Sequence, residues 1–344
     1  MEWKSQHVSM VKDIDFTIGS LNARGINDKG KRMGIFNWAH EKRFDILMLQ
    51  ECYCCENVEA EWADEWGGVC LFSHGSKHSR GTMMLFKKGF DLDIKKKELD
   101  NNGRFIIVKA LIQGEFFYLV NLYAPNSMKD KSKFYKDLSN VLDGMEIDIN
   151  ENVIVGGDWN SIQNYNLDKK GGTVHGKHTV VNSMTELLGH YELIDIWRCR
   201  NPEEKRFTYR QKTPLILSRL DYFMVSNMLQ DNVVEVGITP SIWSDHSAIY
   251  LGIKHLPPFK KGNSHWKFNA SLVMDQDYCN LLGINIDKWQ AEYKVIQDDM
   301  VVWELLKYEI RKFTMSYCSQ KKLDLLKNES VKSKELEKSR NRFS

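Results

Sequence analysis

The chain has 344 residues, 42% of them hydrophobic and 27% charged, so it can bury a full core and is not a disordered protein. No stretch stays apolar for the roughly eighteen residues of a membrane helix, and the N-terminal residues lack the pattern of a signal peptide. Seven cysteines without framework spacing predict reduced thiols in an intracellular protein.

The net charge of +2 is distributed unevenly along the chain. Residues 305–344 hold eleven Lys/Arg against five Asp/Glu, a local charge of +6, which leaves −4 on residues 1–304. A simple DNA-binding module would present a basic face. An acidic body with a basic tail therefore favours an enzyme that gathers carboxylates around a cation.

After a leader over residues 1–13, short apolar runs typical of strands alternate with a few helical patterns as far as residue 256. Helical periodicity appears at Arg32–Glu41, Lys133–Leu142 and Ser183–Tyr191, and Gln113-Gly114-Glu115 predicts a tight hairpin turn. This mixture predicts an α/β sandwich of two sheets. The predicted strands are Phe16–Leu21, Asp45–Leu49, Val69–Phe72, Gly81–Phe86, Phe105–Leu111, Phe116–Leu122, Asn152–Val155, Leu220–Val225 and Ala248–Ile253.

The composition changes after Leu256. Residues 257–265 contain two prolines and a Lys-Lys-Gly-Asn-Ser run and are typical of a linker. Residues 266–344 form a basic extension, in which Trp266–Lys322 is predicted to be helical. The charge run at its end is interpreted as a solvated helical face.

One pattern recurs at four strand ends and carries the chemistry. An apolar run ends in an amide, carboxylate or hydroxyl side chain, and such groups are costly at buried strand ends unless they are paired or bound to a cation. Strand ends that meet at one edge would line a cavity with the oxygen ligands that Mg²⁺ prefers. The four segments are Ser20-Leu21-Asn22, Leu49-Gln50-Glu51, Asn121-Leu122-Tyr123-Ala124-Pro125-Asn126 and Gly156-Gly157-Asp158-Trp159-Asn160.

Two later segments, Ser218-Arg219-Leu220-Asp221-Tyr222 and Ser244-Asp245-His246-Ser247, complete a set of six motifs. In this order and spacing the set resembles the endonuclease/exonuclease/phosphatase superfamily, over about Asp15 to Ile253. The resemblance implies a four-layer α/β/β/α sandwich of two mixed β-sheets flanked by helices, here with a C-terminal helical extension. The domain is expected to span residues 14–256.

Further segments resemble the endonuclease of LINE-type non-LTR retrotransposons. These are Leu167-Asp168-Lys169-Lys170-Gly171-Gly172, Asp195-Ile196-Trp197-Arg198 and Phe207-Thr208-Tyr209. Within the extension, Trp266-Lys267-Phe268-Asn269 and Ser271-Leu272 resemble the segment that connects such a nuclease to a reverse transcriptase. We therefore interpret residues 266–344 as a connector towards a reverse transcriptase that is missing here.

The resemblance assigns metal ligands and a water-activating pair. Glu51 would be the main ligand of Mg²⁺, with Mn²⁺ as a substitute, and Asn22 and Asp245 would lie near the same ion. Asp158 and Asn160 would position and activate the attacking water or protonate the leaving oxygen. Hydrolysis of a phosphodiester needs a cation, an activated water and a stabilised leaving group, so these assignments agree with the chemistry.

The resemblance also assigns contacts to the scissile phosphate. Tyr123 and Asn126 would bind it, and His246 would bind or protonate a phosphate oxygen. Asp221 would orient His246, since a carboxylate on the second ring nitrogen fixes the tautomer. Asp221 and Tyr123 therefore join Asp158, Asn160 and His246 as the predicted catalytic residues.

Each motif also has a purely structural reading. Glu51 could be an exposed strand-end carboxylate, and Asp158 with Asn160 could form only an Asx turn. The ordered set of six motifs favours the functional reading. A zinc site at Cys52, Cys54 and Cys55 is disfavoured because the paired spacing and second ligand pair are lacking.

The leading hypothesis is an endonuclease that nicks one strand of double-stranded DNA and leaves a 3′-hydroxyl, acting in the nucleus with element RNA or a reverse transcriptase as further partners. The alternatives are an abasic-site endonuclease or 3′ exodeoxyribonuclease, and a catalytically silent nucleic-acid-binding relic. A lipid or inositol phosphatase ranks third among the enzymes. No membrane partner is expected.

Overall fold

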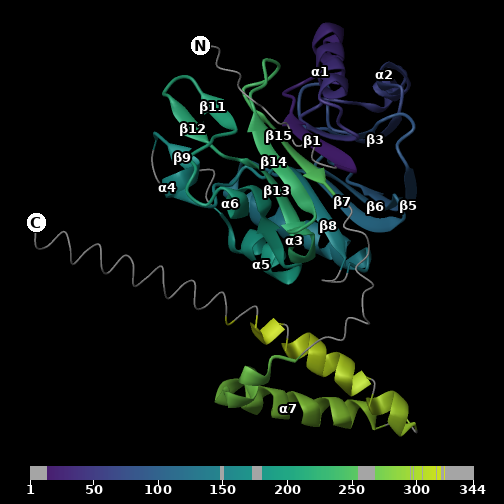
Figure 1. The fold of residues 1–344 in the computed structure, drawn as a ribbon, viewed down its shortest axis with the longest axis vertical. Helices are drawn as coiled ribbons and strands as arrows, with labels where there is room; N and C mark the ends of the chain where they lie inside the picture. The colour runs from purple at the N-terminus through teal and green to yellow at the C-terminus, as the bar shows by residue number, and fades with distance from the viewer. Residues whose placement is uncertain are drawn as a thin grey trace, which may run out of the picture. The chain divides into compact units, whose positions relative to one another are not determined.

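The computed structural model describes residues 14–147, 151–172, 180–254, 268–294, 296, 298–303, 305–314, 316–318 and 321. The chain divides into two compact units, Met1–Pro258 and Phe259–Ser344 (Figure 1). The predicted leader over residues 1–13 and the predicted linker over residues 257–265 lie outside the described residues. No described helix is both long and apolar enough to cross a membrane.

The first six-stranded sheet has the order β14-β15-β1-β2-β4-β3. Its β1–β2 pair is parallel and its other neighbours are antiparallel, so the sheet is mixed. The strands are β1 Phe16–Asn22, β2 Ile46–Gln50, β3 Val69–Ser73, β4 Thr82–Phe86, β14 Val233–Thr239 and β15 Ala248–Ile253.

The second six-stranded sheet has the order β10-β13-β8-β7-β6-β5, with a parallel β7–β8 pair among antiparallel ones. Its strands are β5 Leu92–Leu99, β6 Phe105–Ile112, β7 Glu115–Tyr123, β8 Asn152–Asp158, β10 Leu193–Asp195 and β13 Asp221–Ser226. A small third sheet has the order β11-β12-β9 and consists of β9 Lys169–Lys170, β11 Tyr209–Gln211 and β12 Ile216–Ser218.

Helices cover the outer faces of the two large sheets. α1 and α2 pack against the first sheet and α3 and α5 against the second, which gives the predicted α/β/β/α layers (Figure 1). The α-helices of this unit are α1 Lys29–Glu41, α2 Glu59–Trp66, α3 Met128–Gly144, α4 Tyr165–Asp168, α5 Asn182–His190 and α6 Ile196–Arg200, and its 3₁₀ helices are η1 Glu56–Val58 and η2 Asn227–Leu229.

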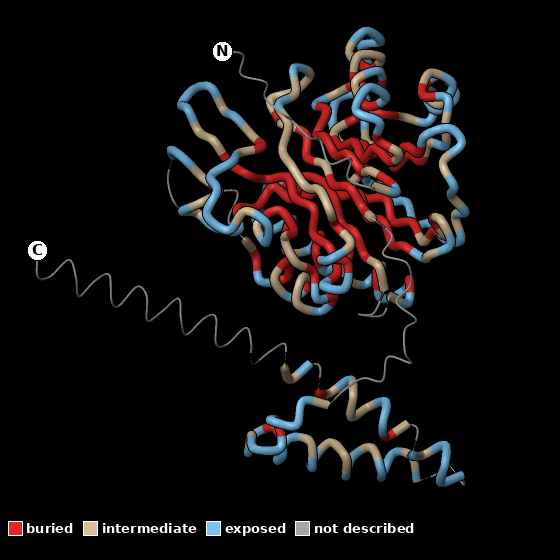
Figure 2. The backbone as a smooth tube through the Cα atoms, viewed as in Figure 1, coloured by how far each residue is buried: buried red, intermediate tan, exposed pale blue. Residues whose placement is uncertain are grey.

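The strand period of two explains the layers. In β2, Ile46 and Met48 point into the core between the sheets, whereas Leu47 and Leu49 pack under α1 and α2. Both faces of the central strands are thus buried, as Figure 2 shows by the red strands at the centre of the unit. Strands buried on both faces require continuous apolar runs, which is why these strands were predictable.

The sequence patterns missed several elements, among them β5, β14 and α2. β5 has mostly exposed side chains and includes Lys95-Lys96-Lys97, β14 is only half-buried, and α2 is short, so none carries a strong apolar pattern. The predicted hairpin turn is confirmed, with Gln113 and Gly114 both at positive φ between β6 and β7.

The continuous helix predicted over residues 266–322 is wrong. The second unit contains η3 Ala270–Met274 and α7 Gln276–Tyr293, and helix resumes at residue 299. Asp275 explains the start of α7, because its side chain accepts from the backbone N–H of Tyr278. The same carboxylate accepts from the Tyr317 hydroxyl at 2.9 Å, which ties the two helical segments together.

Candidate active site

The predicted site residues lie at the ends of strands from both large sheets. From the first sheet come Asn22, the last residue of β1, and Glu51, which directly follows β2. From the second come Asp158, the last residue of β8, and Asp221, the first residue of β13. His246 lies two residues before β15 of the first sheet. We call Asn22, Glu51, Asp158, Asp221 and His246 the acidic rim.

Asn22 joins the two sheets. Its Nδ2 donates to Glu51 Oε1 and to Asp158 Oδ2, each at 2.9 Å, while its Oδ1 accepts from the backbone N–H of Arg24 at 3.1 Å. Asn22 and Asp158 are buried and 136 residues apart in sequence. A fully bonded amide between two carboxylates holds them at a fixed separation, so Asn22 orders the rim whether or not it contacts an ion.

His246 and Asp221 form a second link between the sheets. His246 Nδ1 lies 2.8 Å from Asp221 Oδ2, and His246 Nε2 lies 4.0 Å from Asp158 Oδ2. Burial lowers the pKa of His246, but the Asp221 carboxylate more than offsets this and raises that pKa to about 9. Asp221 therefore favours the protonated imidazole, with Nε2 directed towards Asp158.

Asp158 is the most strongly perturbed carboxylate of the rim. Burial, followed by repulsion from Asp221, raises the pKa of Asp158 to about 7. The two aspartates are direct partners in the β8–β13 register, which explains why they repel one another. A carboxyl group whose pKa lies near neutrality can accept or donate a proton during catalysis.

Asn160 is held by a tight turn after β8. Its backbone N–H donates to Asp158 Oδ1 at 2.9 Å, and its Nδ2 donates to the carbonyl of Ala124 at 2.8 Å. The Asx turn therefore exists, and it places Asn160 beside Asp158. The preceding Gly157 has φ +136°, and a Cβ there would lie 2.0 Å from the carbonyl oxygen of Leu122, so this position requires glycine.

Glu51 adopts a strained backbone conformation. Its φ is +51°, in the left-handed region that residues other than glycine, asparagine and aspartate rarely occupy. Asn160 also has a positive φ, of +48°, which asparagine adopts with less strain. The Tyr53 hydroxyl donates to Glu51 Oε2 at 3.2 Å and helps to hold the carboxylate. Strain of this kind persists at sites where the surrounding structure fixes it, and it tends to cluster where function depends on it.

Tyr123 and Asn126 differ in their surroundings. Tyr123 ends β7 and is buried, with the Arg104 guanidinium 4.7 Å from the centre of its ring. Burial and then the Glu51 carboxylate raise the pKa of the Tyr123 phenol, so it stays a hydrogen-bond donor. Asn126 is exposed, just before the α3 N-cap Ser127.

Asp245 does not join the tight cluster. Its side chain forms an ion pair with Arg24, the neighbour of Ala23 in the loop after Asn22. Among the described residues, the ligand atoms of Asp158, Asp221 and His246 lie within 4.8 Å of one another, a set that omits Asp245 and Glu51. The structure therefore links Glu51 and Asn22 directly and places Asp245 opposite a competing cation.

The donor chemistry of the rim fits a hard divalent cation. The rim holds three carboxylates, of Glu51, Asp158 and Asp221, and one imidazole, and Asp221 Oδ1 is buried without a hydrogen-bond partner among the described residues. Such an excess of largely buried negative charge is unfavourable unless a cation compensates it. Oxygen ligands without thiolates favour Mg²⁺ or Mn²⁺ over softer metals.

The cysteines lie outside this chemistry. Cys52 and Cys54 are free and buried, and Cys55 is partly buried. Burial raises the pKa of the Cys54 thiol to about 12 and that of Cys52 well above its ordinary value. Both stay protonated thiols, which are poor metal ligands.

Sequence reasoning missed four residues that shape the site. Arg24 pairs with Asp245, Tyr53 holds Glu51, and Thr208 Oγ1 accepts from the backbone N–H groups of Leu220 and Asp221 at 2.9 and 3.1 Å. Arg219, in the segment before Asp221, is discussed below. Only Thr208 and Arg219 lay within motifs that the sequence singled out, and neither had a local signal of its role.

The arrangement agrees with comparisons to known proteins. The model of the endonuclease/exonuclease/phosphatase family matches residues 19–246. The chain belongs to this family. It is therefore by family a hydrolase of the nuclease and phosphodiesterase type.

Two curated relatives of this family member are informative. The chain is 27% identical over 308 residues to the transposon TX1 uncharacterized 149 kDa protein of Xenopus laevis, a LINE-type element; the match covers 88% of the chain and 23% of that protein. It is also 27% identical over 248 residues to exodeoxyribonuclease III of Haemophilus influenzae, covering 61% of the chain and 90% of that enzyme. The chain thus spans about a quarter of the first relative.

Solved structures share the fold of this family member. An AP endonuclease, LMAP, from Leishmania major has a TM-score of 0.59 at 18% identity, covering 70% of the chain and 88% of that protein. An AP endonuclease from Archaeoglobus fulgidus has a TM-score of 0.56 at 19% identity. The 3′ phosphatase NExo from Neisseria, solved with a product DNA hairpin, has a TM-score of 0.58 at 18% identity. Each of these two matches covers 70% of the chain and the full length of the solved protein. These likenesses confirm the α/β/β/α sandwich.

Proposed function

We propose that the chain is a divalent-metal-dependent endonuclease that nicks double-stranded DNA by phosphodiester hydrolysis and leaves a 3′-hydroxyl. The observation that carries this proposal is the acidic rim: an excess of carboxylates, joined across two sheets by Asn22 and by the Asp221–His246 pair. The TX1 relative supports the LINE-type specialisation.

The proposed metal site consists of Glu51 and Asn22, with Asp245 released from Arg24 as a further ligand. A bound Mg²⁺ or Mn²⁺ ion would supply positive charge against the charge that grows on the phosphate oxygens. Glu51 already has its carboxylate fixed on both oxygens, by Asn22 and Tyr53, so it would bind without a large loss of side-chain freedom.

In the proposed mechanism the residues of the chain divide three tasks. Asp158, with its pKa raised towards neutrality, accepts the proton of the attacking water, and Asn160 beside it orients that water. His246, held protonated by Asp221, binds a phosphate oxygen through Nε2. The Tyr123 hydroxyl and the exposed Asn126 amide hold the phosphate from the β7 side.

Plasmid nicking tests the proposal. The chain should convert supercoiled plasmid to the open circle with Mg²⁺ or Mn²⁺ and should be inactive in EDTA, and a DNA polymerase should extend from the nick without prior end treatment. Glu51→Gln keeps the shape of the side chain and removes its charge, so the nicking rate should fall by about 10³-fold or more while the far-UV spectrum and thermal midpoint are kept. Full nicking by this variant would remove Glu51 from the site.

The matched control is Glu56→Gln, because Glu56 is exposed and follows Glu51 by five residues. This variant should nick at the wild-type rate. An equal loss in both variants would mean that general surface charge, rather than the rim, governs activity.

A second candidate is an abasic-site endonuclease or 3′ exodeoxyribonuclease, favoured by the match to exodeoxyribonuclease III over 90% of that enzyme. Duplexes with and without one abasic site separate the two functions. Cleavage of the abasic duplex alone would replace the nicking proposal. A wild-type chain that binds DNA and cleaves neither substrate would be the silent relic.

The TX1 likeness also supports proposals on cellular context. A nuclease of a LINE-type element acts on chromosomal DNA, so we place the chain in the nucleus, with element RNA and a reverse transcriptase as partners. Fluorescence microscopy of the tagged chain tests this location.

A further inference from the structure

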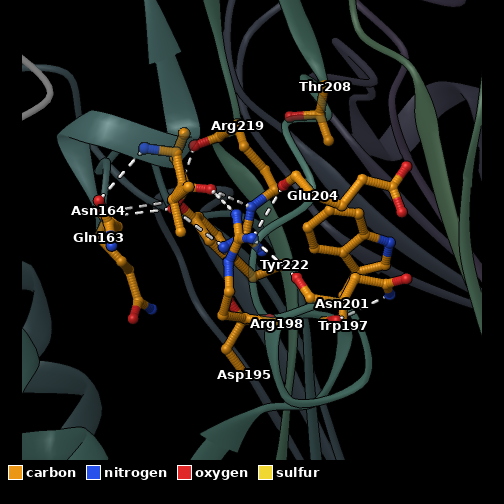
Figure 3. Close-up of polar contacts among 12 residues, drawn as sticks. Gln163, Asn164, Asp195, Trp197, Arg198, Asn201, Glu204, Thr208, Arg219 and Tyr222 are labelled. Carbon is orange, nitrogen blue, oxygen red and sulfur yellow. Dashed lines mark hydrogen bonds and ion pairs between the residues drawn. The ribbon is translucent and has the colours of Figure 1, made fainter.

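A second buried cluster of charges lies next to the acidic rim in sequence. We call Asp168, Asp195, Arg198 and Arg219 the arginine cluster. Arg219 is 1% exposed and Asp168 is fully buried, yet neither belongs to the catalytic set proposed above. Figure 3 shows Arg219 and Arg198 converging beside Asp195, Trp197 and Tyr222.

Hydrogen bonds and ring contacts fix the position and orientation of the Arg219 side chain. Its Nε and Nη2 donate to the two oxygens of Asp168 at 2.8 and 3.0 Å, and Nη2 also donates to Asp195 Oδ2 at 2.6 Å. The guanidinium lies 5.0 Å from the ring centre of Trp197 and 4.4 Å from that of Tyr222. A two-pronged contact to a carboxylate restricts both position and orientation, which a single ammonium group would not do.

The Arg219 backbone leads directly into the acidic rim. Its N–H donates to the carbonyl of Asp168 at 2.8 Å, and its carbonyl accepts from the Tyr222 hydroxyl at 2.7 Å. The carbonyl of the next residue, Leu220, accepts from the backbone N–H of Trp159 at 2.9 Å. Only Leu220 separates Arg219 from Asp221, so a shift of the Arg219 backbone would move Asp221.

The Asp221–His246 contact makes such a shift consequential. Asp221 begins a strand of the second sheet, whereas His246 precedes a strand of the first, so their hydrogen bond spans two sheets. Those sheets meet mainly through an apolar core, and apolar packing is not directional. The direction of the bond must therefore come from polar contacts at each end.

Thr208 connects the same backbone to the histidine side. Its Oγ1 accepts from the N–H of Asp221 at 3.1 Å, and its carbonyl accepts from the N–H of Ser247, next to His246, at 2.6 Å. Thr208 therefore sets the distance between the two partners. The β8–β13 ladder holds Asp221 opposite Asp158, and the arginine cluster anchors the segment that leads into this strand start.

We infer that Arg219 is a positioning residue, which holds Asp221 where it fixes the orientation of the His246 imidazole. A buried ion pair is seldom needed for stability alone, since apolar residues of similar volume often stabilise a core as well or better. Here the pairing lies two residues from a carboxylate whose direction matters. The effect on rate rests on the proposed function, whereas the effect on the His246 geometry does not.

The chain supplies a matched control in Arg32. This arginine is 2% exposed, makes a two-pronged contact to Glu65 at 2.5 and 2.9 Å, and lies 4.9 Å from the ring centre of Trp62. It lies in α1, and its hydrogen bonds go to Glu61, Glu65 and the carbonyls of Ile26 and Asn27 rather than to Asp221 or His246. Arg32→Lys therefore reproduces the loss of a buried, stacked, two-pronged arginine away from the histidine.

The first measurement is proton NMR at one fixed pH in EDTA. The hydrogen-bonded Nδ1 proton of His246 is assigned by its loss in His246→Ala. Arg219→Lys should shift this resonance or broaden it away, whereas Arg32→Lys should leave it unchanged although both variants have lower thermal midpoints. An unchanged resonance in a folded Arg219→Lys would overturn the inference. If Arg219→Lys does not fold, Asp195→Asn takes its place, because it keeps the contact to Asp168 and removes the second anchor.

The second measurement is a double-mutant cycle in plasmid nicking. Arg219→Lys should lower kcat by about 10–100-fold with KM within about twofold, as expected for loss of an orienting partner. In the Asp221→Asn background the same change should add less than about twofold, because the route through Asp221 is already broken. Full multiplicative losses would overturn the inference. If the wild type does not nick at all, the proposed function fails while the resonance still decides the role of Arg219.

Discussion

The acidic rim and the arginine cluster are both charged and largely buried, and Arg219 lies two residues before Asp221, the first residue of β13, yet the two sites are built in opposite ways. In the arginine cluster two guanidinium groups face two carboxylates, and each carboxylate oxygen accepts a hydrogen bond. The rim contains three carboxylates and one imidazole, and Asp221 Oδ1 accepts no hydrogen bond from any residue that the structure describes. The balanced charges of the arginine cluster hold the backbone in place, whereas the surplus negative charge of the rim favours the binding of a cation.

The same contrast appears in the pKa values. In the rim, burial and like-charge repulsion raise the pKa of Asp158 to about 7. In the cluster, the aspartates raise the already high pKa of the Arg219 guanidinium further, despite its burial, so its charge is permanent. Asp158 can therefore exchange a proton near neutral pH, which favours the rim as the chemical part of the pair.

In this comparison, the largest effect on the nicking rate should come from substitution of His246. His246→Ala should slow nicking by about 10²–10⁴-fold and Asp221→Asn by less, because Asp221 acts through the ring. The double mutant should be scarcely slower than His246→Ala, since residues that act as a unit are not additive. Single-turnover rates at saturating Mg²⁺ decide this. Multiplicative losses would assign Asp221 a separate task and break its pairing with His246.

The free energy of unfolding should depend more on the arginine cluster than on the rim. Asp168→Asn leaves two buried guanidinium groups with one carboxylate and should lower the free energy of unfolding by about 3–5 kcal/mol. Asp158→Asn removes one of the crowded rim carboxylates and should leave that free energy unchanged or higher in EDTA. Urea unfolding of the two variants tests the comparison. A larger loss for Asp158→Asn would mean that the rim, too, is a stabilising cluster.

The pH dependence sharpens the same point. The pKa of Asp158 is raised from 3.8 to about 7 on folding, so the folded state binds this proton more tightly than the unfolded state. The contribution of Asp158 to stability is then fully present below pH 4 and is lost as the pH rises through 7. Relative to Asp158→Asn, the wild type in EDTA should lose on the order of a few kcal/mol over this window. Parallel stability curves for the two proteins would contradict the raised pKa.

The smallest effect should come from the edge of the arginine cluster. The Tyr222 hydroxyl lies 2.7 Å from the Arg219 carbonyl and 2.9 Å from that of Ser161. Tyr222→Phe keeps the ring against the guanidinium and removes this contact, so it should cost about 1 kcal/mol of unfolding free energy. Phe223→Leu, in the core between the sheets, gives a reference for the loss of packing without the loss of a hydrogen bond. If Tyr222→Phe lowers the free energy of unfolding as much as Asp168→Asn does, the hydroxyl rather than the ion pairs stabilises the cluster.

The sequence by itself determined the layered sandwich, because strands buried on both faces must be written as continuous apolar runs. It also determined the four strand-end motifs, since polar groups in such places stand out against apolar neighbours. The exposed β5 and half-buried β14 escaped prediction, because their side chains face water and follow no strict period. The break between α7 and the next helical segment escaped for a related reason, as no proline or glycine marks it.

Only the tertiary structure decided which charges meet. Asp158 and Asp221 become neighbours through strand register, Asn22 reaches Asp158 across 136 residues, and Arg219 finds Asp168 across 51. Local patterns depend on neighbours a few residues apart, whereas these pairings depend on how distant strands pair and on how the two large sheets stack. The sequence thus indicated candidate groups for the chemistry, and the fold decided which charged groups stay in surplus and which are neutralised.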